Sequence, residues 1–141
     1  MLTYLHGLGG DFMKIAIYTH QDVTDKPVNR FTYAKLTKAD GDKCKMKASR
    51  LYGKDCEFEY YNDIGCYPSD SIDRPSLNTI IEKIKKEEID VLCVFVLSKL
   101  STDVSLILKI YKLCKAHHVD LITGLDGKKA MTVLDKLLAK K

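Results

Sequence analysis

Side chains able to do acid–base or phosphate chemistry follow a short apolar run near the start of the chain. The run at residues 15–18 gives way abruptly to a polar stretch that contains His20, Asp22 and Asp25. In α/β proteins, ligands bind in the crevice beyond the carboxyl ends of parallel strands. We therefore expect a functional site to begin after this run, in a loop over residues 19–40 that is long and partly mobile.

The elements that must position these residues are read from the periodicity of apolar side chains. Four apolar runs predict strands, at residues 14–18, 57–61, 90–97 and 119–123. Four amphipathic patterns predict helices, at residues 41–53, 75–88, 104–117 and 127–140. We expect Asp73 to cap the second helix, which begins with Pro75, and Asp103 to cap the third. The alternation predicts a three-layer α/β fold, with a mainly parallel sheet between helices.

Composition limits the protein to one domain with a single core. The chain has 141 residues, of which 45% are apolar, and no run is long enough to span a bilayer. There is no signal-peptide pattern, and the five cysteines form no C-x-x-C pair, so we expect reduced thiols and a cytoplasmic location. The histidines and cysteines lack the spacing of metal ligands, and no motif indicates a cofactor.

Positive charge is concentrated in one part of the chain. Residues 26–54 hold nine Lys and Arg against two Asp, a net charge of +7, whereas the remainder holds 14 basic and 17 acidic residues, a net charge of −3. Such a segment can bind phosphate backbones by counterion release, and the residues we select for this role are Lys43, Lys45, Lys47 and Arg50. A solvated helix face is the plainer alternative.

The helix at 104–117 is apolar almost all round. Only Ser105, Lys109 and Lys112 form a polar stripe, so the helix needs cover on more than one side. Deep burial within the domain and contact with a second subunit both satisfy this need. For a subunit contact, the expected residues are Leu106, Ile110 and Leu113.

A glycine-rich stretch, LHGLGGDF at residues 5–12, resembles functional motifs without completing them. No strand precedes it as in a phosphate-binding loop, and no G-x-S-x-G follows as in an α/β-hydrolase. Codons for residues 9–13 can contain a bacterial ribosome-binding sequence just upstream of an ATG. We therefore expect residues 1–12 to be a translated leader and the single domain to run from Met13 to residue 141.

Three blocks share order, spacing and apolar pattern with one known family. They are MKIAIYTHQDVTD at 13–25, YNDIGCYPSDSIDRPSLNTIIEKIKKEEIDVLCVFV at 61–96 and LSKLSTDVSLILKIYKLCKAHHVDLIT at 97–123. The Arg-Pro-x-Leu within the second block is the most specific feature. Over roughly residues 13–126 the chain resembles the catalytic domain of the serine site-specific recombinases, the resolvases and invertases. The resemblance implies their α/β fold and action on DNA.

The resemblance also locates the family's reactive residues and shows that most differ here. The family attacks a DNA phosphate with a serine hydroxyl, and that position holds Asp22, whose negative charge repels phosphate. The arginine two residues earlier is His20, which is largely neutral at pH 7 if its pKa is ordinary.

The third block carries further replacements. The family's Asp-Arg pair becomes Ser98 and Lys99, and its last arginine becomes Thr102. Of the usual set, only Arg74 is unchanged. Losing a nucleophile alone removes several orders of magnitude of rate, so the resemblance implies a former active site rather than a working one.

A new site at the same place is the alternative. Asp22, Arg74, Lys99, Ser98 and Ser101 would lie near one another in this fold. Ion pairing of the aspartate with a neighbouring cation is the plainer expectation, and a repurposed hydrolase or nucleotide site has no positive support.

Three functions stay open from the sequence. The first is an inactive resolvase-like domain that forms homodimers, or mixed dimers with an active recombinase, and regulates it. The second is a nucleic-acid-binding accessory protein that contacts backbone phosphates through the basic segment. The third is a decaying product of a mobile element. We expect no DNA-reading module after the last helix, which stops near residue 141.

Overall fold

The computed structural model describes residues 12–21, 30–64, 74–101, 103–125 and 128–139. Several residues singled out in the sequence lie outside these ranges, namely residues 1–11 of the expected leader, Asp22, Asp25, Cys66, Asp73 and Thr102. No helix in the described ranges is both long enough and apolar enough to cross a membrane.

Four parallel strands form the centre of the protein. The strands are β1 (Met13–Gln21), β2 (Cys56–Ile64), β3 (Val91–Val94) and β4 (Asp120–Thr123). They lie in the order β2-β1-β3-β4, and every neighbouring pair is parallel. The helices are α2 (Arg30–Tyr52), α3 (Pro75–Lys85), α4 (Val104–Ala116) and α5 (Lys128–Ala139), and a 3₁₀ turn, η1 (Leu97–Lys99), follows β3.

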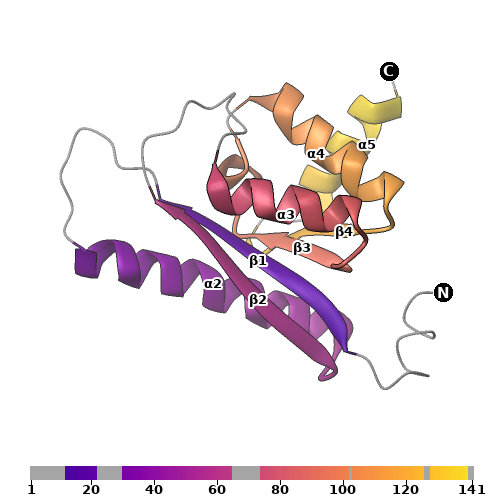
Figure 1. Cartoon of the computed structure of the whole chain (residues 1–141). Helices are drawn as coiled ribbons and strands as arrows, with labels where there is room; N and C mark the ends of the chain where they lie inside the picture. Colours follow the sequence, from indigo (N-terminus) through magenta and orange to yellow (C-terminus); the bar gives the residue numbers. More distant parts are fainter. Residues whose placement is uncertain (1–11, 22–29, 65–73, 102, 126–127, 140–141) are drawn as a thin grey trace.

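Helices cover both faces of this sheet (Figure 1). Helix α2 lies on one side, and α3, α4 and α5 lie on the other. Side chains on β1 alternate accordingly: Ile15 and Ile17 pack in the cluster with α2, whereas Ala16 and Tyr18 pack in the larger cluster with α3 and α4. The predicted three-layer α/β fold is confirmed.

Helix α2 begins eleven residues earlier than the sequence pattern predicted. It starts at Arg30 rather than at residue 41, so the expected loop over 19–40 is partly strand and partly helix. Among its described side chains only Asp40, Gly41, Cys44 and Ala48 are buried. Because the side chains from Thr32 to Ala39 are exposed or half-buried, the sequence pattern gave no helical signal there.

Helix α3 is capped from a neighbouring strand. Its N-cap residue is Arg74, whose side chain makes no capping hydrogen bond, and Pro75 occupies the first turn. Asp63, at the end of β2, accepts hydrogen bonds from the backbone N–H groups of Ser76 (3.0 Å) and Leu77 (3.1 Å). A carboxylate in this position satisfies two helix N–H groups and interacts favourably with the helix dipole.

Helix α4 is covered mainly by its own domain. Asp103 accepts a hydrogen bond from the backbone N–H of Ser105 at 3.0 Å, which confirms the expected cap. Leu106 and Ile110, 6% and 2% exposed, are core residues, and Leu113 is half-buried against the same cluster. Of the two explanations for its apolar surface, burial within the domain accounts for these residues.

Candidate functional site

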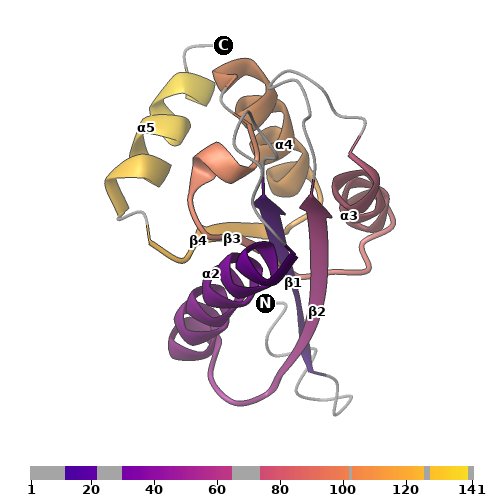
Figure 2. The ribbon, with the colours of Figure 1, turned by 90° about the vertical axis from the view of Figure 1, so that its left-hand side faces the viewer.

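Of the residues that match the recombinase site, those that the structure describes lie at or near the carboxyl ends of β1 and β3. His20 is the penultimate residue of β1, Ser98 and Lys99 lie in η1, and Arg74 precedes α3. Because β1 and β3 are neighbours in the sheet, the topology brings these segments together. In Figure 2, β1 and β2 point in the same direction and end at the same side of the molecule.

Arg74 is turned into the protein rather than toward solvent. Its side chain is 2% exposed. One guanidinium nitrogen donates a hydrogen bond to the backbone carbonyl of Lys99 at 3.2 Å, and the other donates to the carbonyl of Leu100. These two carbonyls belong to the last residue of η1 and the residue after it. The guanidinium therefore links the start of α3 to the segment that leads into α4.

A buried tyrosine connects Arg74 to the cap of α3. The Tyr18 hydroxyl donates to the Asp63 carboxylate at 2.7 Å, and Arg74 donates to the same hydroxyl oxygen at 3.5 Å. The guanidinium also lies over the Tyr18 ring, 5.9 Å from its centroid. Burial, and then the hydrogen bond to Asp63, raise the pKa of Tyr18 far above its ordinary value, so the hydroxyl remains protonated.

Tyr18 and Asp63 were not predicted from the sequence as site residues. Both belong to the blocks that carry the family resemblance, in the first strand and in the Asp-x-Gly of the second block. Successive side chains of a strand point to opposite faces of the sheet. Thr19 faces α2, so Tyr18, the residue before it, faces α3 and α4. The alternation along β1 was the available signal.

The other matched side chains are less enclosed. His20 is half-buried, and its ring stacks on Tyr18 with centroids 6.5 Å apart. Ser98 is exposed and Lys99 is half-buried. Ser101 is buried and accepts a hydrogen bond from the backbone N–H of Asp103 at 2.8 Å. Among the described residues, no group of three His, Cys, Asp or Glu side chains could hold a metal ion.

The basic residues selected from the sequence lie on two flanks of α2. Lys43, Lys47 and Arg50 line one groove of about 270 Å³, together with Met46, Gly124 and Leu125. Lys45 lies on the opposite flank, with its ammonium 5.6 Å from the centroid of the Phe58 ring on β2. The four residues therefore do not form a single patch.

Structural comparison identifies similar proteins of known fold. The chain superimposes on the N-terminal catalytic domain of the TP901-1 integrase with a TM-score of 0.65 and 20% identity, covering 89% of this chain and 92% of that one. A resolvase family site-specific recombinase from Streptococcus pneumoniae gives a TM-score of 0.59 and 23% identity, covering 90% and 86%. The C-terminal catalytic domain of ISC1926 TnpA, an IS607-like serine recombinase, gives 0.64 and 12%, covering 91% and 82%.

Sequence comparison identifies the family. No curated protein matches the chain significantly. The family model described as the resolvase N-terminal domain matches residues 30–140, from the start of α2 through α5. The matched range includes two of the three blocks recognised in the sequence, and the block at 13–25 precedes it. Since the match covers most of the chain, this protein belongs to the resolvase N-terminal domain family.

Proposed function

We propose that this protein is a catalytically inactive resolvase-like domain that acts as a dimerising or regulatory partner of a DNA recombinase. The observation that carries the proposal is the position of Arg74. Its two terminal guanidinium nitrogens donate to main-chain carbonyls of this chain, and the side chain is 2% exposed. A guanidinium held in this way would have to break these hydrogen bonds before its terminal nitrogens could contact a transferring phosphoryl group.

The remaining site residues support the same proposal. A carboxylate at Asp22 lacks the hydroxyl that the family uses as nucleophile, and a lysine at Lys99 lacks the planar fork that binds phosphate through two hydrogen bonds. Thr102 carries no charge where the family has an arginine. The described part of the chain nevertheless buries apolar clusters on both faces of the sheet, which favours a retained structural role over a retained chemical one.

Strand exchange can be tested through its covalent intermediate. The full chain is incubated with labelled duplex DNA over a salt series and analysed on native and denaturing gels, with an active resolvase on its own site as the positive control. We expect no covalent protein–DNA band from this chain. A covalent band that survives denaturation would overturn the proposal and direct attention to Ser98, which is exposed.

Association with a recombinase domain requires exposed apolar residues on α4 or α5. Val104 on α4 and Val133 on α5 are 52% and 54% exposed. We expect sedimentation to show self-association, or association with a recombinase, that weakens in a Val104→Asp, Val133→Asp variant but not in the control Ser105→Asp. Leu106 and Ile110 are unsuitable for this test, since a charge in the core unfolds the domain.

The groove beside α2 favours nucleic-acid binding as a second candidate function. Lys43, Lys47 and Arg50 line it from one side of the helix, and no ion pair within the described ranges neutralises them. Non-specific binding would weaken with salt on a linear log–log plot. Replacing these three residues by Gln should flatten the slope by about two to three, at roughly 0.9 per phosphate contact, whereas Lys45→Gln should change it by one contact or less.

A further inference from the structure

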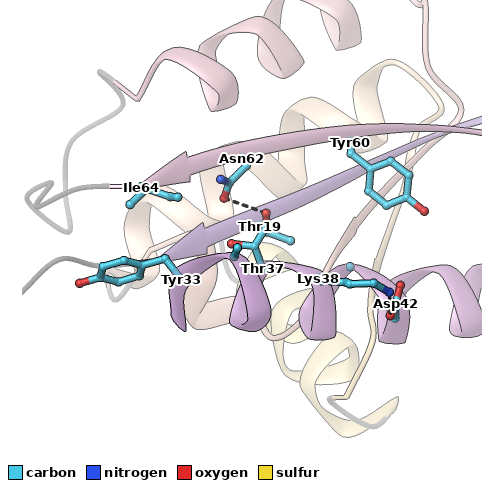
Figure 3. Close-up of a pocket in the computed structure, with 10 residues that line it drawn as sticks. Thr19, Tyr33, Thr37, Lys38, Asp42, Tyr60, Asn62 and Ile64 are labelled. Carbon is cyan, nitrogen blue, oxygen red and sulfur yellow. Dashed lines mark hydrogen bonds and ion pairs between the residues drawn. The ribbon is translucent and has the colours of Figure 1, made fainter. Parts of the chain in front are cut away.

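A second groove lies between the first turns of α2 and the outer strand β2. Its volume is about 870 Å³, within the range of roughly 300–1,000 Å³ typical of small-molecule sites. Figure 3 shows Tyr33 and Tyr60 at its two ends, with Thr37 of α2 and Asn62 of β2 between them.

The groove is open because small residues on α2 face large residues on β2. Ala34 and Gly41 contribute little or no side chain. On the strand, Tyr60 and Ile64 remain 57% and 43% exposed despite facing the helix. The lining is therefore mainly aromatic and aliphatic, and it stands uncovered at the edge of the sheet.

Two hydrogen-bonding groups of the groove can contact a ligand, one buried without a partner and the other exposed. The Thr37 hydroxyl oxygen is buried and makes no hydrogen bond within the described ranges. The Asn62 side-chain oxygen accepts a hydrogen bond from the Thr19 hydroxyl at 2.9 Å, which fixes the amide so that its nitrogen is left with two donors to offer. A buried hydroxyl without a partner is destabilising unless a ligand satisfies it.

The charge of the groove is balanced at its rim. Lys38 and Asp42 form an ion pair with a separation of 2.8 Å. Neither charge is left to attract an ion of opposite sign, so an uncharged ligand is favoured over an anion or a cation.

We propose that this groove binds an uncharged, elongated aromatic molecule carrying a hydrogen-bond acceptor such as a ketone oxygen. The aromatic part lies along the groove between Tyr33 and Tyr60. The acceptor, which has two lone pairs, receives one hydrogen bond from the Asn62 amide and one from the Thr37 hydroxyl. Small-molecule sites commonly combine an apolar lining with a few polar groups in this way.

This site is separate from the residues that match the recombinase site. Thr19 lines the groove on the α2 face of the sheet, whereas Tyr18 and Arg74 lie on the face covered by α3. The proposal therefore does not depend on whether the chain is catalytically inactive. A ligand here would contact α2 and β2 without reaching the face of the sheet that α3 covers.

The test uses the full chain and the uncharged ketone dye 6-propionyl-2-(dimethylamino)naphthalene. We expect saturable binding of one dye per chain, with a blue shift of its emission. Gly41→Leu should weaken binding at least tenfold, because a Cβ there would lie 3.5 Å from the Tyr60 ring and the rest of the side chain would fill the groove. Thr37→Val and Asn62→Leu should each weaken binding about three- to tenfold, the loss of one hydrogen bond.

Met46→Ala is the matched control, because Met46 is 63% exposed on α2 and lines the other groove. Circular dichroism and denaturation establish that each variant is folded. Absence of saturable binding, or binding unchanged in both Gly41→Leu and Asn62→Leu, would overturn the proposal. So would a wild-type dimer that Gly41→Leu converts to a monomer, since the groove would then be a subunit contact.

Discussion

Replacing Arg74 tests whether this arginine stabilises the fold or is reserved for binding a phosphate. Its guanidinium donates to the carbonyls of Lys99 and Leu100, and the side chain is 2% exposed. In the Arg74→Ala variant both carbonyls lose this donor, and α3 loses its attachment to the turn after β3. An arginine reserved for substrate would instead be replaceable at little cost to the fold.

The magnitude follows from these two bonds. A hydrogen bond from a charged donor contributes about 1.5–3 kcal/mol, and Arg74 donates two such bonds to main-chain carbonyls. We expect Arg74→Ala to lower the free energy of unfolding by about 3–5 kcal/mol. For a domain of this size the melting temperature should fall by roughly 10–17 °C. Arg74→Lys should lose about half as much, because one ammonium cannot reproduce the fork.

The assay is equilibrium denaturation followed by far-UV circular dichroism at pH 7. Arg50→Ala is the control, since Arg50 is exposed on α2 and its removal should change stability by no more than about 0.5 kcal/mol. Lys99→Ala should leave the free energy of unfolding nearly unchanged, because Arg74 uses only the backbone carbonyl of Lys99. Unchanged or increased stability in Arg74→Ala would refute the structural role assigned to this residue.

Four other predictions follow from the packing and from the titration of buried groups. Gly41→Ala should stabilise the protein by about 1 kcal/mol in mid-helix, its Cβ making ordinary contact with the Tyr60 ring. Gly124→Ala should lower the free energy of unfolding by about 1–3 kcal/mol, because its Cβ would lie 3.3 Å from the backbone of α2. If denaturation shows the same change in stability for Gly41→Ala and Gly124→Ala, the packing described is contradicted. Tyr18 has a raised pKa in the folded state, so stability should fall as the pH rises above about 10, where the unfolded chain ionises first, and Tyr18→Phe should make this fall shallower in a pH series. Burial raises the pKa of Cys114 to about 12, so a thiol reagent should modify it only at the rate of unfolding; rapid modification of the native protein would contradict its burial.

The sequence predicted the sheet better than it predicted the first helix. β1 and β3 are buried on both faces, and their apolar runs were therefore recognisable. α2 buries only a short band around Cys44 and Ala48, and its first turns lie over the open groove. The apolar run at 90–97 also exceeded β3, because the chain turns into η1 soon after Val94 while its side chains remain apolar.

The position of the candidate site was predictable, but its internal geometry was not. Parallel topology alone brings the ends of β1 and β3 together, which places His20 near η1. The direction of the Arg74 side chain depends on a hydroxyl from β1 and on main-chain carbonyls after β3. Main-chain acceptors leave no pattern in a sequence, so these hydrogen bonds of Arg74 could not be predicted from it.

The buried geometry gives a structural reason for an arginine at position 74, where the family resemblance also expects one. Arg74 supports the fold through carbonyls that any sequence would supply, and Asp63 supports it by capping α3. Replacing either residue would therefore reduce stability even in a protein that never cuts DNA. Ser98 is exposed, so a substitution there costs the fold little. On the proposed loss of catalysis, selection for folding alone is enough to retain Arg74, and its presence is not evidence of strand exchange.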